Sequence, residues 1–268
     1  MNRSYAFVST CSHDGWKEYG EKFVKSFIDH YPVDAHLYMY IDFSPTIKHE
    51  RVTYRKISDC YGLDDFQTYI KNLGFSKGKA IVSDTHDQAH SPHIIWNASK
   101  FSFKVFSVEH CVINSTEDVV TWVDADTIAF QDIGVEFISS IIPPYCLLNY
   151  LGRSEKYTEC GYVSYNKQHP DCRKFVQDFA DLFRTGAIFS MKEWHDSYIF
   201  DILRYVYEKF NNDINYNISF EVMEYDHVFI NCSLGGYLDH LKGPRKSEGK
   251  SRQADLKASH ATAYWSAA

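Results

Sequence analysis

The order of apolar and polar positions along the first forty residues predicts a strand, a helix and a second strand. Tyr5–Thr10 and His36–Ile41 are short runs rich in aromatic and aliphatic side chains, which favour extended structure. Between them, residues 16–30 carry apolar side chains at helical spacing, and Pro32 ends that pattern. This order is typical of the start of a doubly wound α/β sheet, in which the loops that follow the strands face the ligand.

The rest of the chain continues this alternation with longer connections. We expect helices around 64–73, 96–111 and within 128–142, and strands at Val119–Val123 and 146–151. The polar connection 83–93 contains three histidines that fit a solvated loop better than a metal cluster: His86, His90 and His93. No Pro/Gly/Ser-rich linker divides the 268 residues, so we predict one α/β domain with a single mixed, mostly parallel sheet flanked by helices.

The most informative segment is the end of the predicted strand Val119–Val123, where Asp124 and Asp126 follow a continuous apolar run. Such a run suits a strand buried on both faces, and open α/β sheets bind ligands beyond the carboxyl ends of their strands. In extended backbone, residues two apart point the same way, so both carboxylates can address one ion. A hard divalent cation that carries a diphosphate is the natural partner for two neighbouring carboxylates. Simple turn residues or helix caps are the alternative.

Composition narrows the class of protein. The net charge of −7 argues against a broad electrostatic surface for nucleic acid, so nucleic acid is expected only as an acceptor. Seven cysteines without paired spacing indicate reduced thiols rather than a disulfide framework or a zinc site. The first residues lead directly into a strand, which argues against a signal peptide, and no run reaches membrane-spanning length. We therefore expect a cytoplasmic protein without integral membrane contact.

Two lysines precede the acid pair on one predicted helix. Lys100 and Lys104 are four residues apart, so they share a face of the helix 96–111. That face is either a solvated basic surface or a cationic wall that leans over the nucleotide and the two acids.

A mixture of aromatic and charged residues near 153–161 is typical of a sugar or acceptor pocket. It contains Arg153, Glu159 and Gly161, and a structural Glu–Arg pair is the alternative for the first two. Asp196 stands at a predicted helix start, where the helix dipole stabilises either a capping or a catalytic carboxylate. We assign it as a general base, with His195 beside it to orient an acceptor hydroxyl.

The last informative segment joins a histidine to a cluster of cations. His240 can supply a nitrogen to a metal that carboxylates already hold. Lys242, Arg245 and Lys246 gather positive charge around Gly243, whose bare backbone lets a diphosphate approach closely. A run of surface charges is the alternative.

With these segments in place, the chain resembles the glycosyltransferases of the nucleotide-sugar-binding, Rossmann-like type called GT-A. The resemblance runs over residues 4–246, and Asp124-Ala125-Asp126 is its most specific part. The late His240 with Lys242-Gly243 resembles the His-x-x-Gly-x-x-Lys signature of the glycogenin and lipopolysaccharide galactosyltransferase families. The segment departs from that signature at its end, where Arg245-Lys246 replaces the final Lys-Pro-Trp.

The resemblance implies a ligand for each candidate residue. Asp126 and His240 would bind Mn²⁺ or Mg²⁺, and Asp124 would contact the metal or the ribose. The acceptor or sugar pocket would take Arg153, Glu159, Gly161 and His195. The nucleotide-sugar would lie against residues from the first loop, the basic helix, the acid pair and the late segment: Thr10, Lys100, Lys104, Asp124, Lys242, Gly243 and Arg245.

The expected activity is metal-dependent transfer of a sugar from a nucleotide-diphosphate sugar, with a UDP-sugar favoured, to a hydroxyl acceptor. A bacterial glycan and a modified DNA base are both candidate acceptors, and inversion and retention of configuration both stay open. Residues 1–246 would form the catalytic domain, and 247–268 would form a tail that closes as a lid or stays disordered. A metal-dependent nucleotidyltransferase or phosphohydrolase and a non-catalytic nucleotide-sugar-binding domain are the alternatives.

Overall fold

The computed structural model describes residues 3–74, 77–79, 95–211 and 214–266. Their central feature is a mixed sheet whose strands run in the order β10-β8-β9-β6-β1-β2-β3. In chain order these are β1 (Tyr5–Thr10), β2 (His36–Ile41), β3 (Val52–Lys56), β6 (Val119–Val123), β8 (Leu148–Tyr150), β9 (Tyr162–Asn166) and β10 (Asn215–Asn217). β9 is antiparallel to β6 and β8, and the other neighbouring strands of this sheet are parallel. The predicted α/β class with a mixed, mostly parallel sheet is confirmed.

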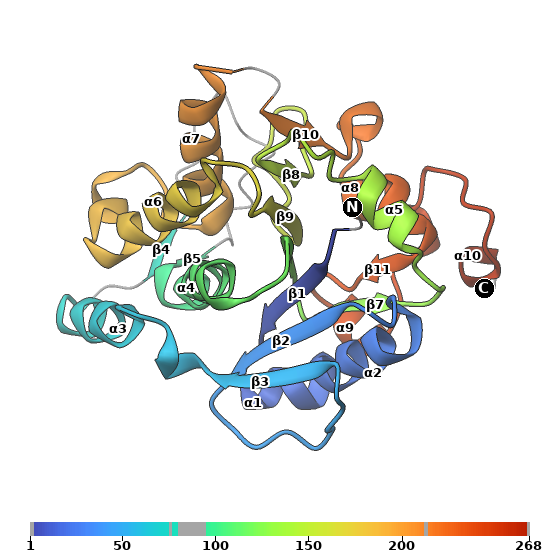
Figure 1. Ribbon diagram of the computed structural model, residues 1–268, viewed down its shortest axis with the longest axis horizontal. Helices are drawn as coiled ribbons and strands as arrows, with labels where there is room; N and C mark the ends of the chain where they lie inside the picture. Colours follow the sequence, from blue (N-terminus) through green and yellow to red (C-terminus); the bar gives the residue numbers. More distant parts are fainter. Residues whose placement is uncertain (1–2, 75–76, 80–94, 212–213, 267–268) are drawn as a thin grey trace.

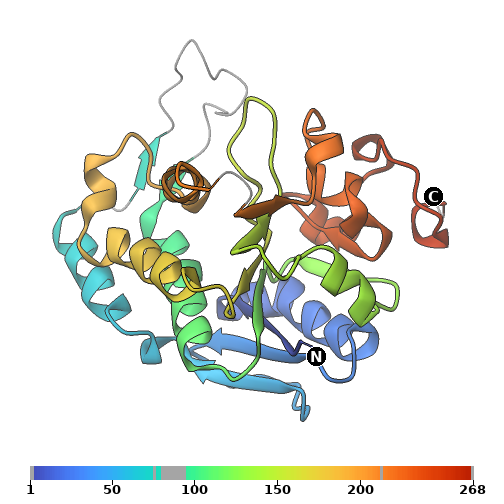
Figure 2. The same cartoon turned by 45° about the horizontal axis from the view of Figure 1, so that its top comes forward.

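Helices cover both faces of the sheet (Figure 1, and Figure 2 after rotation). One face packs against α3 (Leu63–Asn72), α4 (Ala98–Asn114), α6 (Cys172–Arg184) and α7 (Asp196–Glu208). The other face packs against α2 (Glu21–His30), α5 (Val135–Ser140) and α8 (Val228–Asn231). The short helix α1 (His13–Gly15) and the π-helical turn η1 (Trp16–Gly20) lead directly into α2.

The alternation of side chains along β1 explains the two layers. Ala6 and Val8 belong to the apolar cluster under α4, whereas Tyr5 and Phe7 belong to the cluster under α2. Every residue of β6 is buried, as expected for a strand that is covered on both faces. The acids that follow Val123 therefore emerge from a strand that is held firmly on both sides.

A small antiparallel ribbon follows directly after β6. It consists of β7 (Thr127–Ala129) and β11 (Leu238–His240), paired so that Thr127 stands opposite His240. A second antiparallel pair joins β4 (Lys77–Lys79) to β5 (Ile95–Asn97). The remaining short helical segments are η2 (Ile57–Asp59), η3 (Ala187–Ser190), η4 (Phe220–Val222), η5 (Ser233–Gly236), α9 (Arg245–Glu248), η6 (Gln253–Asp255) and α10 (Ala263–Ser266).

The predicted bounds of β1 and β2 are confirmed, and β6 and α4 lie where the sequence predicts them. The helix expected within 128–142 is wrong in its first part, since the chain there continues β7 and α5 begins only at Val135. Pairing with β11, which lies far along the chain, fixes that short strand, and local periodicity does not record such pairing. The strand β3 and the helix α6 have no predicted counterpart. The connection 83–93 lies outside the described residues.

The C-terminal segment 249–266 packs beside β11 and α8, at the end of the molecule away from α3 (Figures 1 and 2). Trp265 is 4% exposed, and its Nε1 donates to a backbone carbonyl at 2.7 Å. The hydroxyl of Tyr264 donates to Oδ2 of Asp239 at 2.8 Å. The segment therefore braces the strand β11, while its predicted closure over a ligand stays a prediction.

All seven cysteines lie in the described part of the chain and are free thiols, six of them buried. Among the described residues, no helix combines the length and the apolar composition that crossing a bilayer requires.

Candidate functional site

The candidate site begins at the carboxyl end of β6, where Asp124 and Asp126 leave the sheet. The N–H of Asp124 donates to the carbonyl of Gly161 at 2.9 Å, and the N–H of Thr127 donates to the carbonyl of Asp124 at 3.0 Å. These bonds close a tight turn around Ala125. The turn directs both carboxylates toward the same region, as the sequence predicts, but the extended backbone on which that prediction rested is wrong, because residues 125 and 126 form the turn.

His240 completes a group of three candidate metal ligands. One oxygen each of Asp124 and Asp126 and one nitrogen of His240 all lie within 4.8 Å of one another. The Nε2 atom of His240 is 3.2 Å from Asp126 and 3.6 Å from Asp124. The histidine reaches the acids because β11 pairs with β7, which follows the acid turn immediately. The structure thus brings the three predicted ligands together.

The ring of His240 is held in place by its surroundings. A Cβ atom at Gly161 would lie 2.7 Å from a ring carbon of His240, so only glycine leaves room for this ring. On the other side, Nε2 of His227 donates to the carbonyl of His240 at 3.1 Å. Burial and the neighbouring His240 lower the pKa of His227 to about 4, which keeps this donor neutral. The ring of Phe229 packs with its centroid 5.0 Å from that of His240.

The charges of the three groups stabilise one another. Burial would raise the pKa of Asp126, but His240 and Lys246 outweigh it and hold that pKa well below its ordinary value. Burial would lower the pKa of His240, and Asp126 raises it instead. Two carboxylates and one imidazole form a mixed oxygen and nitrogen donor set, which fits Mn²⁺ or Mg²⁺. The residues present therefore suit the predicted divalent ion.

Lys104, on α4, links the acid pair to the start of α7. Its Nζ is 3.1 Å from Asp124, and it donates to Asp196 at 2.7 Å and to the carbonyl of Cys160 at 2.8 Å. It also lies 5.0 Å from the centroid of the Trp122 ring, whose Nε1 donates to Asp124 at 2.6 Å. Burial would lower the pKa of Lys104, but Asp124 and Asp196 raise it, so the ammonium stays charged. Lys104 therefore contacts the acids, whereas among the described residues no such contact is found for Lys100.

The three cations of the late cluster have three different partners. Nζ of Lys246 is 2.8 Å from Asp126, and it lies 4.8 Å from the centroid of the Tyr19 ring. The guanidinium of Arg245 instead pairs with Asp255 at 2.6 Å, in the C-terminal segment. Sequence reasoning gathered both cations around the diphosphate but assigned only Arg245 of the two as a nucleotide-sugar-binding residue. Counted from His240, however, Lys246 stands at the lysine position of His-x-x-Gly-x-x-Lys, and that spacing is the signal that identifies it. The departure that the sequence analysis placed at Arg245-Lys246 is therefore wrong, since the chain differs from the signature only after this lysine.

Lys242 takes a third direction, toward Glu159. Its ammonium pairs with Oε2 of Glu159, and the guanidinium of Arg153 lies 3.9 Å from the same oxygen. The other oxygen of Glu159 is 3.7 Å from Nδ1 of His240. The Glu–Arg pair of the sequence prediction therefore exists, and it borders the candidate metal ligands as well.

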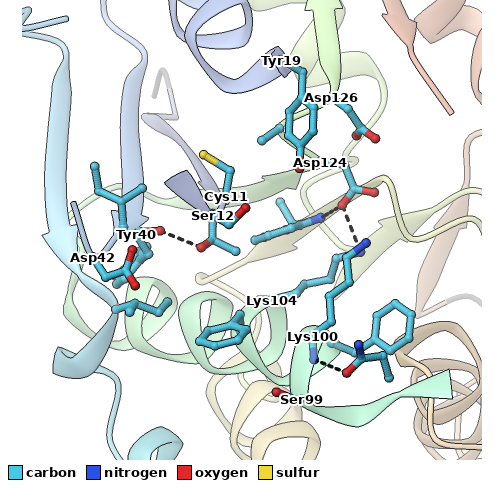
Figure 3. A pocket seen from close by; sticks show the side chains of 18 of the residues that line it. Cys11, Ser12, Tyr19, Tyr40, Asp42, Ser99, Lys100, Lys104, Asp124 and Asp126 are labelled. Atoms are coloured by element: carbon cyan, nitrogen blue, oxygen red, sulfur yellow. Dashed lines mark hydrogen bonds and ion pairs between the residues drawn. The ribbon is translucent and has the colours of Figure 1, made fainter. Parts of the chain in front are cut away.

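Two cavities meet at the acid pair. The first has a volume of about 430 Å³ and lies at the ends of β1, β2 and β6, under α4 (Figure 3). Predicted residues in its lining are Thr10, Lys100, Lys104, Asp124 and Asp126; residues that the sequence prediction lacked include Cys11, Ser12, Tyr19, Tyr40, Asp42, Trp122 and Lys246. In Figure 3, Lys104 points to Asp124, and Tyr19 lies next to the acids. Strand ends thus supply most of this wall.

The second cavity has a volume of about 500 Å³ and is lined by the same acids. It shares four lining residues with the first: Phe101, Lys104, Asp124 and Asp126. The rest of its wall comes mainly from loops and from the start of α7: Arg153, Lys156, Tyr157, Glu159, Cys160, Gly161, His195, Asp196, Ser197, His240, Lys242 and Gly243. The predicted sugar or acceptor residues are therefore gathered in one cavity.

Two residues at the start of α7 have different roles. Asp196 is the first residue of the helix and is 4% exposed, whereas the helix cap is His195, whose Nδ1 accepts from the N–H of Tyr198 at 3.1 Å. Because Nδ1 accepts, the ring proton is on Nε2, which donates to Glu193 at 2.7 Å. Both nitrogens of His195 are thus engaged, and the residue offers the cavity the rest of its ring. Asp196 faces Lys104 inside the cavity.

Comparisons with known proteins give distant similarities only. No protein-family model matches the chain, and no curated protein matches it significantly. Among solved structures, the apo form of mouse xyloside xylosyltransferase 1 is similar with a TM-score of 0.47 and 10% identity, over 81% of this chain and 85% of that one. The glycosyltransferase GlyE of Streptococcus pneumoniae TIGR4 is similar with a TM-score of 0.43 and 14% identity, over 81% of this chain. The match spans 45% of GlyE.

Proposed function

We propose that the protein is a metal-dependent glycosyltransferase that moves a sugar from a nucleotide-diphosphate sugar to a hydroxyl acceptor. The observation that carries this proposal is the position of Asp124, Asp126 and His240 at the meeting point of two cavities. A group-transfer enzyme needs space for a donor and for an acceptor, and the acceptor hydroxyl must reach the carbon at which the donor bond breaks. The resemblance of the sequence to GT-A glycosyltransferases supports the same assignment.

The first cavity is the donor side in this proposal. It lies beyond the carboxyl ends of β1, β2 and β6, where open α/β sheets bind nucleotides. A UDP-sugar is the first donor to test. Lys246 and Lys104 border the acids from two directions, and each can stabilise negative charge on a departing diphosphate. Neither lysine needs to move far, because both already lie within 3.1 Å of an acid.

Asp124, Asp126 and His240 would hold the divalent ion, Mn²⁺ or Mg²⁺, between the two cavities. When bound there, such an ion supplies a Lewis acid for the diphosphate. The protein contributes the geometry of this site through the acid turn and through the β7 and β11 pairing.

The second cavity is the acceptor side. Asp196 is the carboxylate there that can take the proton of an attacking hydroxyl if configuration is inverted. In a retaining reaction the same carboxylate positions the acceptor or the sugar through Lys104. Glu159 and Arg153 provide hydrogen-bond partners for hydroxyl groups at the opposite wall.

A donor screen tests this function. Purified protein with Mn²⁺ is incubated with UDP-, GDP-, CMP- and dTDP-sugars, and nucleotide release is measured. We expect release from one donor, its loss in Asp126→Asn, and its retention in the matched control Asp132→Asn, whose side chain is 89% exposed. Release of inorganic phosphate, or transfer of the nucleotide itself, would point to a phosphohydrolase or a nucleotidyltransferase. Donor binding without any release would point to a non-catalytic binding domain.

A further inference from the structure

A third cavity adjoins the acceptor side and has no assigned role. Its volume is about 390 Å³, and three residues line both it and the acceptor cavity: Arg153, Lys156 and Tyr157. The remaining wall comes largely from the outer face of α7 and includes Tyr198, Ile202 and Tyr205. Each of the two cavities falls within the roughly 300–1,000 Å³ that is usual for a ligand pocket. The acceptor side therefore has room for a ligand that extends beyond the reacting group.

The wall of this third cavity is rich in tyrosine. The rings of Tyr157 and Tyr198 meet edge to face with centroids 5.3 Å apart, and Tyr205 is 56% exposed. Tyrosine combines a flat apolar face with a hydroxyl group at its edge. A sugar ring presents the matching surfaces, since its C–H groups can pack on an aromatic face while its hydroxyls form hydrogen bonds.

Three of the five charged side chains that line the same cavity are engaged by protein groups, and the other two, Glu155 and Lys192, are exposed and carry opposite charges. Lys156 pairs with Asp226 at 2.5 Å, and Nε of Arg153 donates to the carbonyl of Tyr157 at 2.6 Å. Asp201 accepts from the N–H of Thr158 at 2.8 Å and also pairs with Arg204. An anionic polymer such as nucleic acid would have to displace these pairs. A neutral, hydroxyl-rich ligand can bind without doing so.

The geometry points to a second sugar subsite in this third cavity, so that the acceptor is an oligosaccharide of two or more rings. The first ring would present its hydroxyl to Asp196 in the acceptor cavity. The next ring would lie against Tyr198 and Tyr205. This inference rests on the proposed glycosyltransferase function, whose acceptor class it specifies, and it disfavours a DNA base as acceptor.

The test is glycan binding by the full chain on an array of mono-, di- and trisaccharides of common hexoses, with nucleotide release from the donor measured in parallel. We expect at least about tenfold stronger binding of a disaccharide than of its terminal monosaccharide, which corresponds to about 1.4 kcal/mol. Tyr205→Ala should abolish that length preference and leave nucleotide release unchanged. The matched control is Tyr145→Ala, because Tyr145 is 67% exposed and lies outside these cavity linings.

The outcomes separate this inference from the proposed function. Equal binding of mono- and disaccharides, or a length preference that survives Tyr205→Ala, would overturn the second subsite. Nucleotide release without any glycan binding would also overturn it, while leaving the transferase intact. Tyr205-dependent disaccharide binding without nucleotide release from any donor would support the subsite and refute the transferase.

Discussion

The two cavities that meet at Asp124 and Asp126 differ in how their walls are built. The first cavity, which we propose as the donor cavity, is formed mostly by the ends of β1, β2 and β6 and by α4, which pack into the buried core. The second, which we propose as the acceptor cavity, is formed mostly by loops around residues 153–161 and 240–243, with the start of α7. A wall of strand ends is rigid, whereas loops are more mobile and tolerate more substitutions. Mutations in one cavity should therefore change either donor cleavage or transfer to the acceptor, but not both. The acids that both cavities share are the exception.

The largest effect is expected at the shared acids. Asp126→Asn removes a carboxylate that both His240 and Lys246 contact, so it should weaken Mn²⁺ binding and lower donor cleavage and transfer together. We expect a fall of about 1,000-fold in the rate, comparable to the loss of a strong transition-state contact. Mn²⁺ binding is measured by calorimetry, and chelation by EDTA should abolish the wild-type activity until Mn²⁺ is restored. A variant that keeps full Mn²⁺ affinity would show that the acid turn is not the metal site.

The next effect should separate the two cavities. Asp196→Asn should lower transfer to an acceptor by about 100-fold or more, as expected for a lost general base. Cleavage of the donor by water and Mn²⁺ binding should stay close to wild type, since Lys104 keeps its second partner Asp124. Asp132→Asn, with a side chain that is 89% exposed and outside both cavity linings, is the control. Equal loss of transfer and of donor cleavage would mean that Asp196 acts on the donor, and the division of roles would fail.

The sequence predicts the donor side better than the acceptor side, for a physical reason. The strands β1 and β6 are continuous apolar runs, so the chain itself indicates where they end and where Asp124 and Asp126 emerge. The acceptor wall depends on contacts between distant loops. The cap of α7 is one example, because His195 takes the capping position that an aspartate would ordinarily fill.

The late cations show the same limit of prediction from sequence, namely that local spacing does not give the direction of a side chain. Gly243 has a φ of +57°, a left-handed turn after which α9 begins, and consecutive helical residues point about 100° apart. Arg245 and Lys246 must therefore face different partners. Composition and spacing indicate that a cation reaches the acids. The signature spacing singles out Lys246, but the physical reason is the direction in which the chain leaves Gly243, and only the folded structure defines that direction.

A pair of variants tests this assignment on the donor side. Lys246→Met should weaken donor binding by about tenfold, because it removes one charge-assisted contact to the diphosphate. Arg245→Met should change donor binding by no more than about twofold, since its guanidinium pairs with Asp255. Binding of UDP in the presence of Mn²⁺ is measured by calorimetry at two salt concentrations. The reverse order of effects would return Arg245 to the diphosphate.

The smallest effect is expected in the C-terminal segment, and it tests whether this segment closes over the donor cavity as a lid. Trp265 anchors this segment to η5, and Tyr264 anchors it to β11. A lid would have to release or shift these contacts when the donor binds. We therefore expect limited proteolysis within 249–266 to proceed at the same rate with and without UDP and Mn²⁺.

The control for that experiment is Trp265→Ala, which removes a buried ring and should cost about 3 kcal/mol of local packing. Cleavage in the segment should then become faster, and Mn²⁺ affinity should fall a few-fold, because β11 also carries His240. Strong protection of the wild-type segment by UDP and Mn²⁺ would instead establish the lid. The donor wall would then include one mobile element, and the contrast between a rigid donor side and an adaptable acceptor side would hold only for the closed state.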